Sequence, residues 1–542
     1  MSEETETYSQ PQKKKARSAV LGHAVESLTR GRVSSPLVTL DKFHRLSDYC
    51  VQYINQYGRV DLTEPMAAIR SHWEAVQVSR VGNRSPNDLK VLFLCGPEPL
   101  NDLEELIGLG VAPENVWAVE GDEKAFRKAA TELREAGRPI KLHQGSLHEF
   151  LSVVPEQFDI VYFDACGPLF GGKPKTSTVL RELFLNQRMA PLSVLITNFA
   201  AKPRDTEDEW VKRLSVWYAP RYFQPVWGNI DGAFAAERIS EPDEFYAHIK
   251  KNLEGYYSDF VSRFTIEFAS QLLPWWRARA LPSARRAYFG PESRLNDAIA
   301  SAFSNGVVED ASANHAEVLK SLFDTIGHAQ LSPAQYQFLW TAKLAVERLK
   351  PNDPLLEILT KDTLLNARLC DAINAVSLVR NFFESIGGGW GQHNRHACSD
   401  ELREVLERFH WFDSPGAPWD RMFCDSPLPN LVIDMLMGVY GYPYHTNMEK
   451  LKRIEYTAKQ TPMYSDVFVL DQCRYMYDLI PTLAMFGDSL PPDRQLQIRI
   501  CISLIGRHTF ESCRDLYRGS ALADMAVEGF NIIGWPNRDI IH

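Results

Sequence analysis

Hydrophobic and polar positions follow two different patterns along this chain, and the change between them falls near Leu89. Between Leu37 and Gln77 the apolar residues recur at helical spacing, which predicts a small helical entry segment. From Leu89 to Phe199, short β-rich runs alternate with helical stretches. This alternation is typical of a parallel sheet with helices on its faces. The five runs read LKVLFL, NVWAVE, IKLHQG, FDIVYFD and LSVLITNF.

Strand signals become sparse after Phe199, and the second half of the chain is predicted to be mostly helical. Residues 244–280 carry a long helical pattern. The stretch 332–350 opens with Ser332 as N-cap, Pro333 at the first helical position and Gln335 three residues after the cap. Similar capped helices are predicted at 399–409 and 491–508. No fixed-period repeat is present, which disfavours a solenoid.

These patterns divide the chain into four parts. A length of 542 residues is too great for one ordinary core, so more than one domain is expected. We predict a disordered tail over 1–33, a helical entry segment over 34–85, a parallel-sheet domain over 86–240 and a mostly helical C-terminal domain over 241–542. The fold class is α/β.

Composition favours a soluble cytoplasmic protein. Hydrophobic residues make up 45% and charged residues 24%, close to globular averages. No apolar run is long enough to span a membrane, and the polar N-terminus does not resemble a secretory signal. Nine scattered cysteines without a CxxC pair fit a reducing compartment.

Charge leaves one open question at the N-terminus. The formal net charge of −10 gives the whole molecule no attraction for a phosphate backbone. The run KKKAR, Lys13 to Arg17, is the one obvious basic cluster. It is either a solvated disordered tail or a signal for nucleic-acid binding or import.

The turn after the first predicted strand points to an unphosphorylated nucleoside ligand. A dinucleotide fold uses G-x-G-x-x-G, whose second glycine lets pyrophosphate approach the backbone. Here the residue two positions after Gly96 is Glu98, which would repel a pyrophosphate and disfavours an NAD-dependent oxidoreductase. S-adenosylmethionine carries a positive sulfonium and no phosphate. Glu120 ends the next strand, 24 residues after Gly96, where a carboxylate can accept hydrogen bonds from both ribose hydroxyls.

On these residues the chain resembles the class I S-adenosylmethionine-dependent methyltransferases, over about Leu89 to Ala200. VLFLCGPEP resembles the first motif of that family, VWAVEGD its acidic strand end, LHQGSLHEFL its adenine-contacting strand end and FDIVYFDACGPL its fourth motif. The resemblance implies a Rossmann-like methyltransferase domain over 86–240. It also implies S-adenosylmethionine as cofactor, bound by Cys95, Gly96, Glu98, Glu120, Gly121, Ser146, Leu147 and Asp164.

Within that set the resemblance implies different roles. Gly96 lines the methionine moiety, Glu120 holds the ribose, and Ser146 with Leu147 meets the adenine edge. Asp164 lies beside the transferred methyl group and is the candidate catalytic base. An aspartate before a Gly-Pro turn is equally suited to capping that turn.

The chain also departs from the family pattern. The first motif has one glycine, Gly96, where two or three are usual, and the third strand ends in Gly145-Ser146 where Gly-Asp is usual. The fourth motif, beginning at Asp164, lacks the Pro-Pro-aromatic sequence of amino-group methyltransferases. The alternative function is therefore a degenerate, non-catalytic methyltransferase fold that acts as a binding or assembly module.

No metal is expected. A metal-dependent variant would use Asp164 with Thr197 and Asn198, but threonine in place of a second acid removes a charged ligand. We interpret Cys166 as a buried thiol. The acceptor is not readable, nucleic acid and protein both stay open, and the helical C-terminal region offers a surface for a protein partner.

Two further groups of residues are interpreted as structural. The first, in a glycine-rich loop, has the spacing of zinc ligands but lacks a second pair. The second consists of tryptophans that could stack bases but more often pack in cores. They are His393, His396 and Cys398, and Trp275, Trp276, Trp411 and Trp419.

Overall fold

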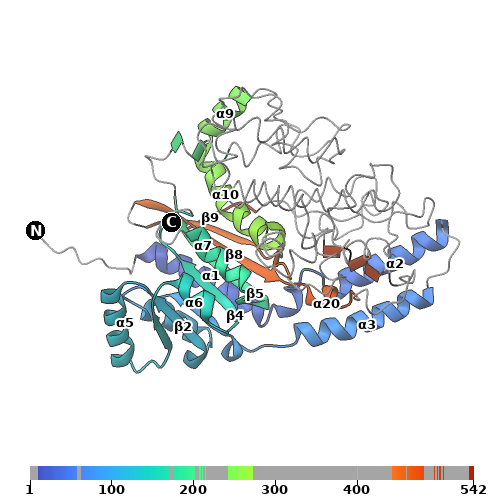
Figure 1. Cartoon of the computed structure of the whole chain (residues 1–542), viewed down its shortest axis with the longest axis horizontal. Helices are drawn as coiled ribbons and strands as arrows, with labels where there is room; N and C mark the ends of the chain where they lie inside the picture. The colour runs from blue at the N-terminus through green and yellow to red at the C-terminus, as the bar shows by residue number, and fades with distance from the viewer. Residues whose placement is uncertain are drawn as a thin grey trace, which may run out of the picture.

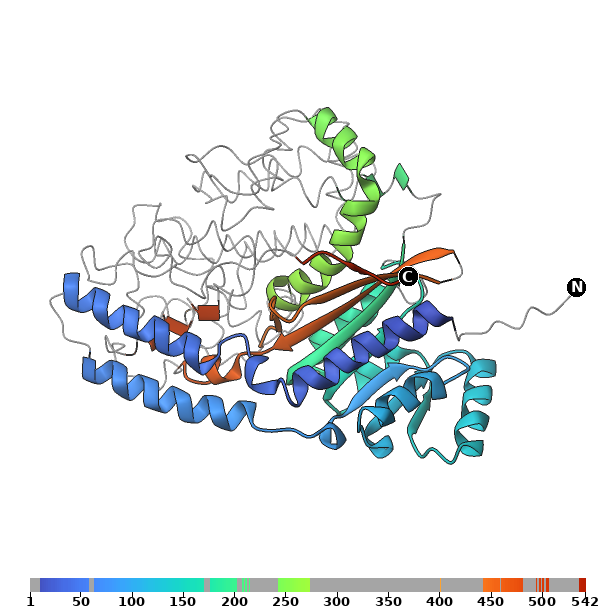
Figure 2. The same cartoon turned by 180° about the vertical axis from the view of Figure 1, so that it is seen from behind.

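The computed structural model describes residues 10–57, 63–169, 176–201, 242–272, 442–458, 460–480 and 536–542. It also describes the isolated positions 207, 208, 210, 211, 214, 400, 494, 497, 498, 500, 501, 504 and 505. Figures 1 and 2 show the described helices and strands from opposite sides. Some of the helices rest on a central sheet and others extend away from it, and the C-terminus lies at one edge of the sheet.

The described strands form one nine-stranded sheet in the order β3-β2-β1-β4-β5-β8-β7-β9, with β6 paired to β8. The pairs from β3 to β5 are all parallel. This 3-2-1-4-5 order is that of a Rossmann-like sheet, so the predicted α/β class is confirmed. The five parallel strands are β1 (Val91–Leu94), β2 (Val116–Glu120), β3 (Lys141–Gln144), β4 (Phe158–Asp164) and β5 (Met189–Ala200). The others are β6 (His445–Thr446), β7 (Lys452–Ala458), β8 (Thr461–Asp471) and β9 (Asp539–Ile540).

Strands from the last hundred residues complete this sheet, which the sequence did not indicate. β8 runs antiparallel to β5, from Leu192 opposite Asp471 to Ala200 opposite Met463. The expected sheet domain over 86–240 therefore does not contain the whole sheet, and the described part of 241–542 is not only helical. The turn between β7 and β8 contains Gln460 in the left-handed region (φ 79°), without the Asn-Gly or Asp-Gly pair that usually marks a hairpin.

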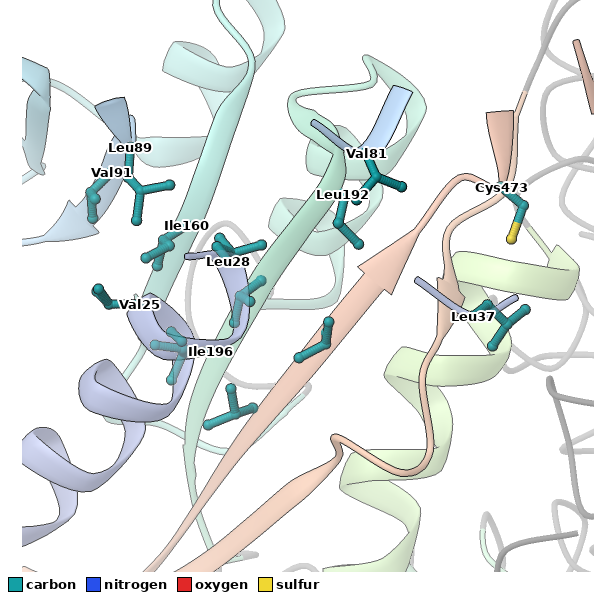
Figure 3. Close-up of a cluster of buried hydrophobic side chains, with 14 of the residues drawn as sticks. Val25, Leu28, Leu37, Val81, Leu89, Val91, Ile160, Leu192, Ile196 and Cys473 are labelled. Atoms are coloured by element: carbon teal, nitrogen blue, oxygen red, sulfur yellow. The ribbon is translucent and has the colours of Figure 1, made fainter. Parts of the chain in front are cut away.

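Helix α1 (Pro11–Leu28) occupies most of the region expected to be a disordered tail, so that expectation is wrong for these residues. Val20, Leu21, Ala24, Val25 and Leu28 repeat at helical spacing, and each is at most 4% exposed. Burying one such aliphatic side chain stabilises the fold by about 1.5 to 3 kcal/mol, which outweighs the solvation of the lysine run before it. Figure 2 shows α1 lying across one face of the sheet, and Figure 3 shows its apolar side chains among those of β4 and β5.

Strand alternation determines which side chains meet α1. Ile160 and Tyr162 of β4 and Ile196 of β5 belong to the same buried cluster as α1. Since side chains two residues apart share a face of a strand, Asp164 and Asn198 point to that face as well. They are paired neighbours in the parallel ladder. The α1 face thus changes from apolar to polar where β4 and β5 reach their carboxyl ends.

Helices α2 (Leu40–Tyr57) and α3 (Thr63–Val81) lie side by side and extend away from the sheet (Figure 1). Phe43 stacks on Trp73 with ring centroids 3.9 Å apart. The indole Nε1 of Trp73 lies 2.7 Å from Sδ of Met476 in the short helix α20 (Arg474–Tyr477). The entry segment is therefore helical, as predicted, and packs against residues that follow β8.

The remaining described helices pack around the sheet or extend from it (Figure 1). They are α4 (Leu100–Gly108), α5 (Glu123–Glu135), α6 (Leu147–Val153), α7 (Thr176–Leu185), α9 (Pro242–Lys251) and α10 (Leu253–Glu267), with a π turn at Phe268–Leu272 and 3-10 turns at Arg32–Ser34, Pro86–Asp88 and Pro113–Asn115. No helix within the described residues combines the length and apolarity needed to cross a membrane.

A buried ion pair fixes the C-terminal residues to this frame. The guanidinium of Arg538 contacts the carboxylate of Asp466 in β8, and the two side chains are 6% and 0% exposed. Arg538 also donates to the carbonyl oxygen of Ser258 in α10 at 2.8 Å. Consequently β9, which pairs with β7, is held by a charged contact as well as by its short ladder.

Replacing Arg538 with alanine leaves the fully buried Asp466 without this cation. Removing one partner of a buried pair typically costs about 3 to 5 kcal/mol, so we expect Arg538→Ala to lower the free energy of unfolding by that amount in urea titrations. The control is Arg127→Ala, because Arg127 pairs with Glu123 on the surface and exposed pairs contribute about 0 to 1 kcal/mol. Equal stability of the two variants would contradict a stabilising role for the Arg538–Asp466 ion pair.

Candidate functional site

The strand order reverses between β1 and β4, since β1 has β2 on one side and β4 on the other. In open α/β sheets, ligands bind at such a switch point, outside the carboxyl ends of the strands. The sequence-predicted site residues end β2 and β4 or lie in the turns that follow β1, β2 and β3. The fold therefore brings them to one edge of the sheet.

The turn after β1 has the backbone expected of a ligand-binding loop. Gly96 adopts φ +58°, in the left-handed region that side chains rarely tolerate, and an added Cβ would meet nothing within 4 Å. The glycine is thus needed for its conformation and leaves open space beside it. Cys95 before it is buried, and its amide donates to the carbonyl of Val119 at 3.3 Å. Burial, followed by the charges of Glu120 and Asp102, raises the pKa of the Cys95 thiol to about 12, so this thiol is protonated at neutral pH.

Glu98 begins the approach to α4. Its carboxylate accepts a hydrogen bond from Nδ2 of Asn101 at 3.1 Å and lies 3.6 Å from Nζ of Lys128 in α5. The side chain is 26% exposed. A negative group therefore stands where a dinucleotide site would have a bare backbone, in agreement with the exclusion of a pyrophosphate.

Glu120 stands at the carboxyl end of β2 and uses little of its hydrogen-bonding capacity within the described part of the chain. One oxygen accepts the backbone N–H of Asp122 at 2.8 Å, and Asp122 in turn caps α5 through Ala125 at 2.8 Å. Among the described residues, Glu120 forms no ion pair. The second carboxylate oxygen can accept hydrogen bonds from a ligand, as a ribose-binding acid must.

The end of β3 lies against that of β2. The amide of Gly145 donates to the carbonyl oxygen of Glu120 at 3.0 Å, and a Cβ at Gly121 would come within 3.6 Å of the Gly145 carbonyl. Ser146 caps α6 by accepting the N–H of Glu149 at 3.2 Å, and Leu147 is buried as the first residue of that helix. The Ser146 hydroxyl is thus engaged as an acceptor, while its proton is left for a ligand.

Asp164 at the end of β4 is the centre of a polar cluster on the α1 face. Its Oδ2 lies 3.0 Å from Nζ of Lys13 in α1. Its Oδ1 accepts from Nδ2 of Asn198 at 2.6 Å and from the thiol of Cys166 at 3.0 Å. The same Asn198 amide donates to the hydroxyl of Tyr456 in β7 at 2.8 Å. Three segments, α1, β5 and the loop after β4, therefore donate to one carboxylate, and β7 joins the cluster through Asn198.

The cluster keeps Asp164 ionised. Burial alone would raise the pKa of this carboxyl, but the charge of Lys13 and the hydrogen bonds from Cys166, Lys13 and Asn198 bring it below its usual range. Burial would lower the pKa of Lys13, yet the charge of Asp164 raises it. Desolvation of the thiol and the charge of Asp164 raise the pKa of Cys166 to about 12. The site thus holds a fixed ammonium, a fixed carboxylate and a neutral thiol.

Cys166 differs from its sequence interpretation as a buried thiol, because the residue is exposed. It follows the end of β4 and adopts φ 51°, a strained conformation for a residue with a side chain. Its thiol is nevertheless crowded by polar groups, with Lys13 Nζ at 3.9 Å.

A second ion pair joins α1 to α4 one helical turn further on. Arg17 Nε lies 2.5 Å from Oδ1 of Asp102, and both side chains are below 10% exposed. Burial, with the nearby charge of Asp164, raises the pKa of Asp102 to about 6 although Arg17 and Lys13 oppose this. Asp102 is mostly ionised at neutral pH, so the site carries two acids matched by two cations from α1.

The cluster does not fit a divalent cation bound by Asp164. The ammonium of Lys13 takes the position beside Oδ2 that a metal ligated there would need, and Asn198 presents its amide nitrogen to Oδ1. No group of three or more His, Cys, Asp or Glu side chains suited to a metal lies within the described ranges.

Sequence reasoning missed Lys13, Arg17, Asp102 and Tyr456. The basic run containing Lys13 predicts either a solvated tail or a signal for nucleic-acid binding or import, and neither reading includes the helix whose buried residues begin at Ala16. Tyr456 lies in a strand whose signal was not detected. The zinc-like histidine group and the four tryptophans considered from the sequence lie outside the described residues.

Comparison with known proteins gives only remote structural likeness. No family model matches the chain, and no curated protein matches it. Among solved structures it is similar to an S-adenosylmethionine-dependent methyltransferase from Clostridium acetobutylicum ATCC 824, at 16% identity over 24% of this chain and 50% of that chain, with a TM-score of 0.17. It is also similar to PKMT2 from Rickettsia typhi in complex with AdoHcy, at 10% identity over 46% and 48%, with a TM-score of 0.19.

A third similar structure is the plantazolicin methyltransferase BamL in complex with a triazolic desmethylPZN analog and SAH, at 12% identity over 44% of this chain and 75% of that chain, with a TM-score of 0.17. The chain spans about half the length of the first two structures. Because these TM-scores are low, the Rossmann-like fold is assigned from the strand order and not from these neighbours.

The Lys13–Asp164 pair predicts a pH-dependent loss of stability in Lys13→Met. In the wild type the lowered pKa of Asp164 gives a stabilising contribution that is present above the unfolded value of about 3.9 and lost as pH falls through the folded value. Without Lys13, burial raises the pKa of Asp164, so the variant is destabilised as pH rises through that raised value. We expect a loss of about 3 kcal/mol at pH 8 and a smaller loss at pH 5.

Urea titrations at the two pH values measure this difference. Lys14→Met is the matched control, because Lys14 is exposed on the same helical turn. A loss for Lys13→Met that does not change with pH would show that the lysine stabilises the fold by packing and not by its charge.

Proposed function

We propose that this protein is an S-adenosylmethionine-dependent methyltransferase-like protein that binds its cofactor along the carboxyl ends of β1 to β4. The acceptor is a substrate outside this chain, and the described part of the C-terminal region contributes strands to the cofactor-binding sheet. A cytoplasmic location and a protein partner bound by the C-terminal region, both expected from the sequence, belong to this proposal.

The observation that carries the proposal is the placement of Glu120. Its carboxylate stands at the end of the strand next to the switch point, has no ion-pair partner among the described residues and has one oxygen available. Two vicinal hydroxyls are well suited to such a group, because charge-assisted hydrogen bonds are stronger than neutral ones. The acids Glu98 and Glu120 also favour a cationic ligand over a pyrophosphate.

The other residues have roles that follow from their positions. The Gly96 turn gives the methionine part access to open space, while Ser146 and Leu147 at the start of α6 would meet adenine. Cys95 and Gly121 would line the site with backbone atoms and a small side chain, next to the Gly96 turn and the start of α6. Once bound, S-adenosylmethionine supplies an activated methyl group, and the chain supplies orientation and exclusion of water.

A second candidate is a binding module that no longer transfers methyl groups. The ion pair of Asp164 with Lys13 favours it, because an ionised carboxylate with a lowered pKa is a weak proton acceptor. The engagement of Ser146 as a helix cap favours it as well. Catalysis would need Asp164 to act by positioning or charge, or to exchange Lys13 for a substrate.

Calorimetric titration with S-adenosylmethionine and S-adenosylhomocysteine tests the cofactor assignment, with NAD as the comparison ligand. We expect both sulfur compounds to bind and NAD not to bind. Glu120→Ala should weaken binding by about 1.5 to 3 kcal/mol, which is the scale of losing charge-assisted hydrogen bonds. Glu123→Ala, an exposed glutamate in the first turn of α5, is the control. Wild-type affinity in folded Glu120→Ala would remove this residue from the site.

Asp164→Asn separates the enzyme from the binding module. If the protein transfers methyl groups, this variant should keep its cofactor affinity while transfer falls about 100-fold, because adenine and ribose are held elsewhere. Incubating cell extract with labelled cofactor and each protein would detect labelled products, with Asp41→Asn at the surface as the control. A protein that binds cofactor but labels nothing in nucleic-acid, protein and small-molecule fractions is the binding module.

A further inference from the structure

The group of polar atoms around Asp164 has the composition of a binding site for an organic cation. The carboxylate is ionised and nearly buried, with 9% of its side chain exposed. Asn198 and Cys166 donate to one of its oxygens, so the other oxygen is directed to a cation. In this structure that cation is Lys13.

Besides the carboxylate oxygen that pairs with Lys13, the site contains a hydrogen-bond acceptor that has no donor among the residues described, Oδ1 of Asn198. Oδ1 of Asn198 is buried and accepts no hydrogen bond from any described residue, although the residue is only 1% exposed. Since an ionised carboxylate can only accept, the amide nitrogen must face Asp164, and the oxygen is therefore the unpartnered atom. A buried acceptor without a donor costs free energy, so an N–H donor that reached it would be favoured.

Lys13 is less buried than Arg17, the cation one turn further along α1. The buried residues of α1 begin at Ala16, whereas Lys13 lies in the first turn with Lys14 and Lys15 exposed. The Lys13 side chain is 12% exposed, while that of Arg17 is 6% exposed and its partner lies in α4. The first turn is also tied to β7, where Gln12 accepts the backbone N–H of Thr457 at 3.1 Å, and to the C-terminus, where Lys15 donates to the carbonyl oxygen of His542 at 3.1 Å. Because Lys13 precedes the buried residues of α1, its side chain can leave Asp164 while the apolar part of the helix stays in place.

We propose that Asp164, Asn198 and Tyr456 form a recognition site for a lysine ammonium of a basic peptide, and that Lys13 occupies this site as an internal stand-in for the substrate. The inference rests on the proposed function in one respect: it names the class of acceptor, a lysine side chain presented beside the cofactor. The bound ammonium would have to release a proton to solvent before its nitrogen could form a bond to the methyl group, whose bond to the cofactor sulfur would break in the same step. The chain's own run KKKAR then resembles the sequence that the site accepts. Occupation of a substrate site by Lys13 also accounts for the buried Lys13–Asp164 ion pair, because a buried ion pair by itself adds little stability compared with apolar packing.

Binding of a synthetic peptide tests the proposal directly. The probe is QPQKKKARSAV, which copies residues 10–20, and its control carries acetyllysine at all three lysine positions. Lys13→Met empties the site, so the probe should bind at least about tenfold more tightly than to the wild type, as expected when an internal competitor no longer occupies most of the molecules. The acetylated peptide should show no such gain.

The matched variant is Lys13→Met combined with Asp164→Asn, which removes the same lysine and also the carboxylate. It should lose the gain and bind the probe no better than the wild type. If the double variant binds as tightly as Lys13→Met, or if Lys13→Met binds no better than the wild type, the proposal is overturned.

A measurement on the wild type covers the case in which Lys13→Met does not fold. Acylation footprinting should show Lys13 less reactive than Lys14 and Lys15. Excess probe with N-terminal acetylation and dimethylated lysines, which stays cationic but cannot be acylated, should raise the reactivity of Lys13 about threefold or more by displacing it. Unchanged reactivity at millimolar probe would contradict displacement.

Calorimetry with S-adenosylmethionine on the same samples distinguishes the two proposals. Cofactor binding without a peptide gain contradicts the peptide site alone and leaves the proposed function standing. A peptide gain without cofactor binding contradicts the proposed function and leaves a lysine-binding site.

Discussion

A buried carboxylate needs a counter-charge, and the organisation of the site depends on how Asp164 obtains one. Strand alternation directs Asp164 to the α1 face at the carboxyl end of β4, where burial alone would disfavour its charge. Lys13 satisfies it at 3.0 Å, and Arg17 does the same for Asp102 one turn further on. The two pairs determine where the first turn of α1 lies. The apolar face from Ala16 to Leu28 supplies most of the stabilising burial that holds the helix there.

The carboxyl edge of the sheet then has two chemically different halves. On the side of β2 and β3, Glu120 offers an available carboxylate oxygen beside the ends of short, tightly paired strands. On the side of β4 and β5, Asp164 is already saturated by donors from α1, β5 and the loop after β4. The first half suits a nucleoside with vicinal hydroxyls, and the second suits a cationic nitrogen. Gly96 lies between them, in the turn after β1.

Local sequence patterns predicted the parts of the fold that depend on local signals. The parallel strands from Val91 to Ala200 were identified because fully buried strands read as β-rich apolar runs, and Glu120 and Asp164 were identified because each ends such a run. β7 and β8 were missed because β8 joins the parallel strands by pairing with β5 across some 250 intervening residues, and because the turn between β7 and β8 has Gln460 where glycine is usual. Lys13 was misread because a lysine run looks solvated unless its partner, 151 positions away, is known.

The central claim is that the carboxyl edge binds S-adenosylmethionine through Glu120. A crystal structure of the protein with S-adenosylhomocysteine tests this claim most directly. The account predicts both ribose hydroxyls within hydrogen-bond distance of the Glu120 carboxylate and adenine beside Ser146 and Leu147. It also predicts the homocysteine part over the Gly96 turn. A ligand bound elsewhere, or bound at this edge without contact to Glu120, would contradict it.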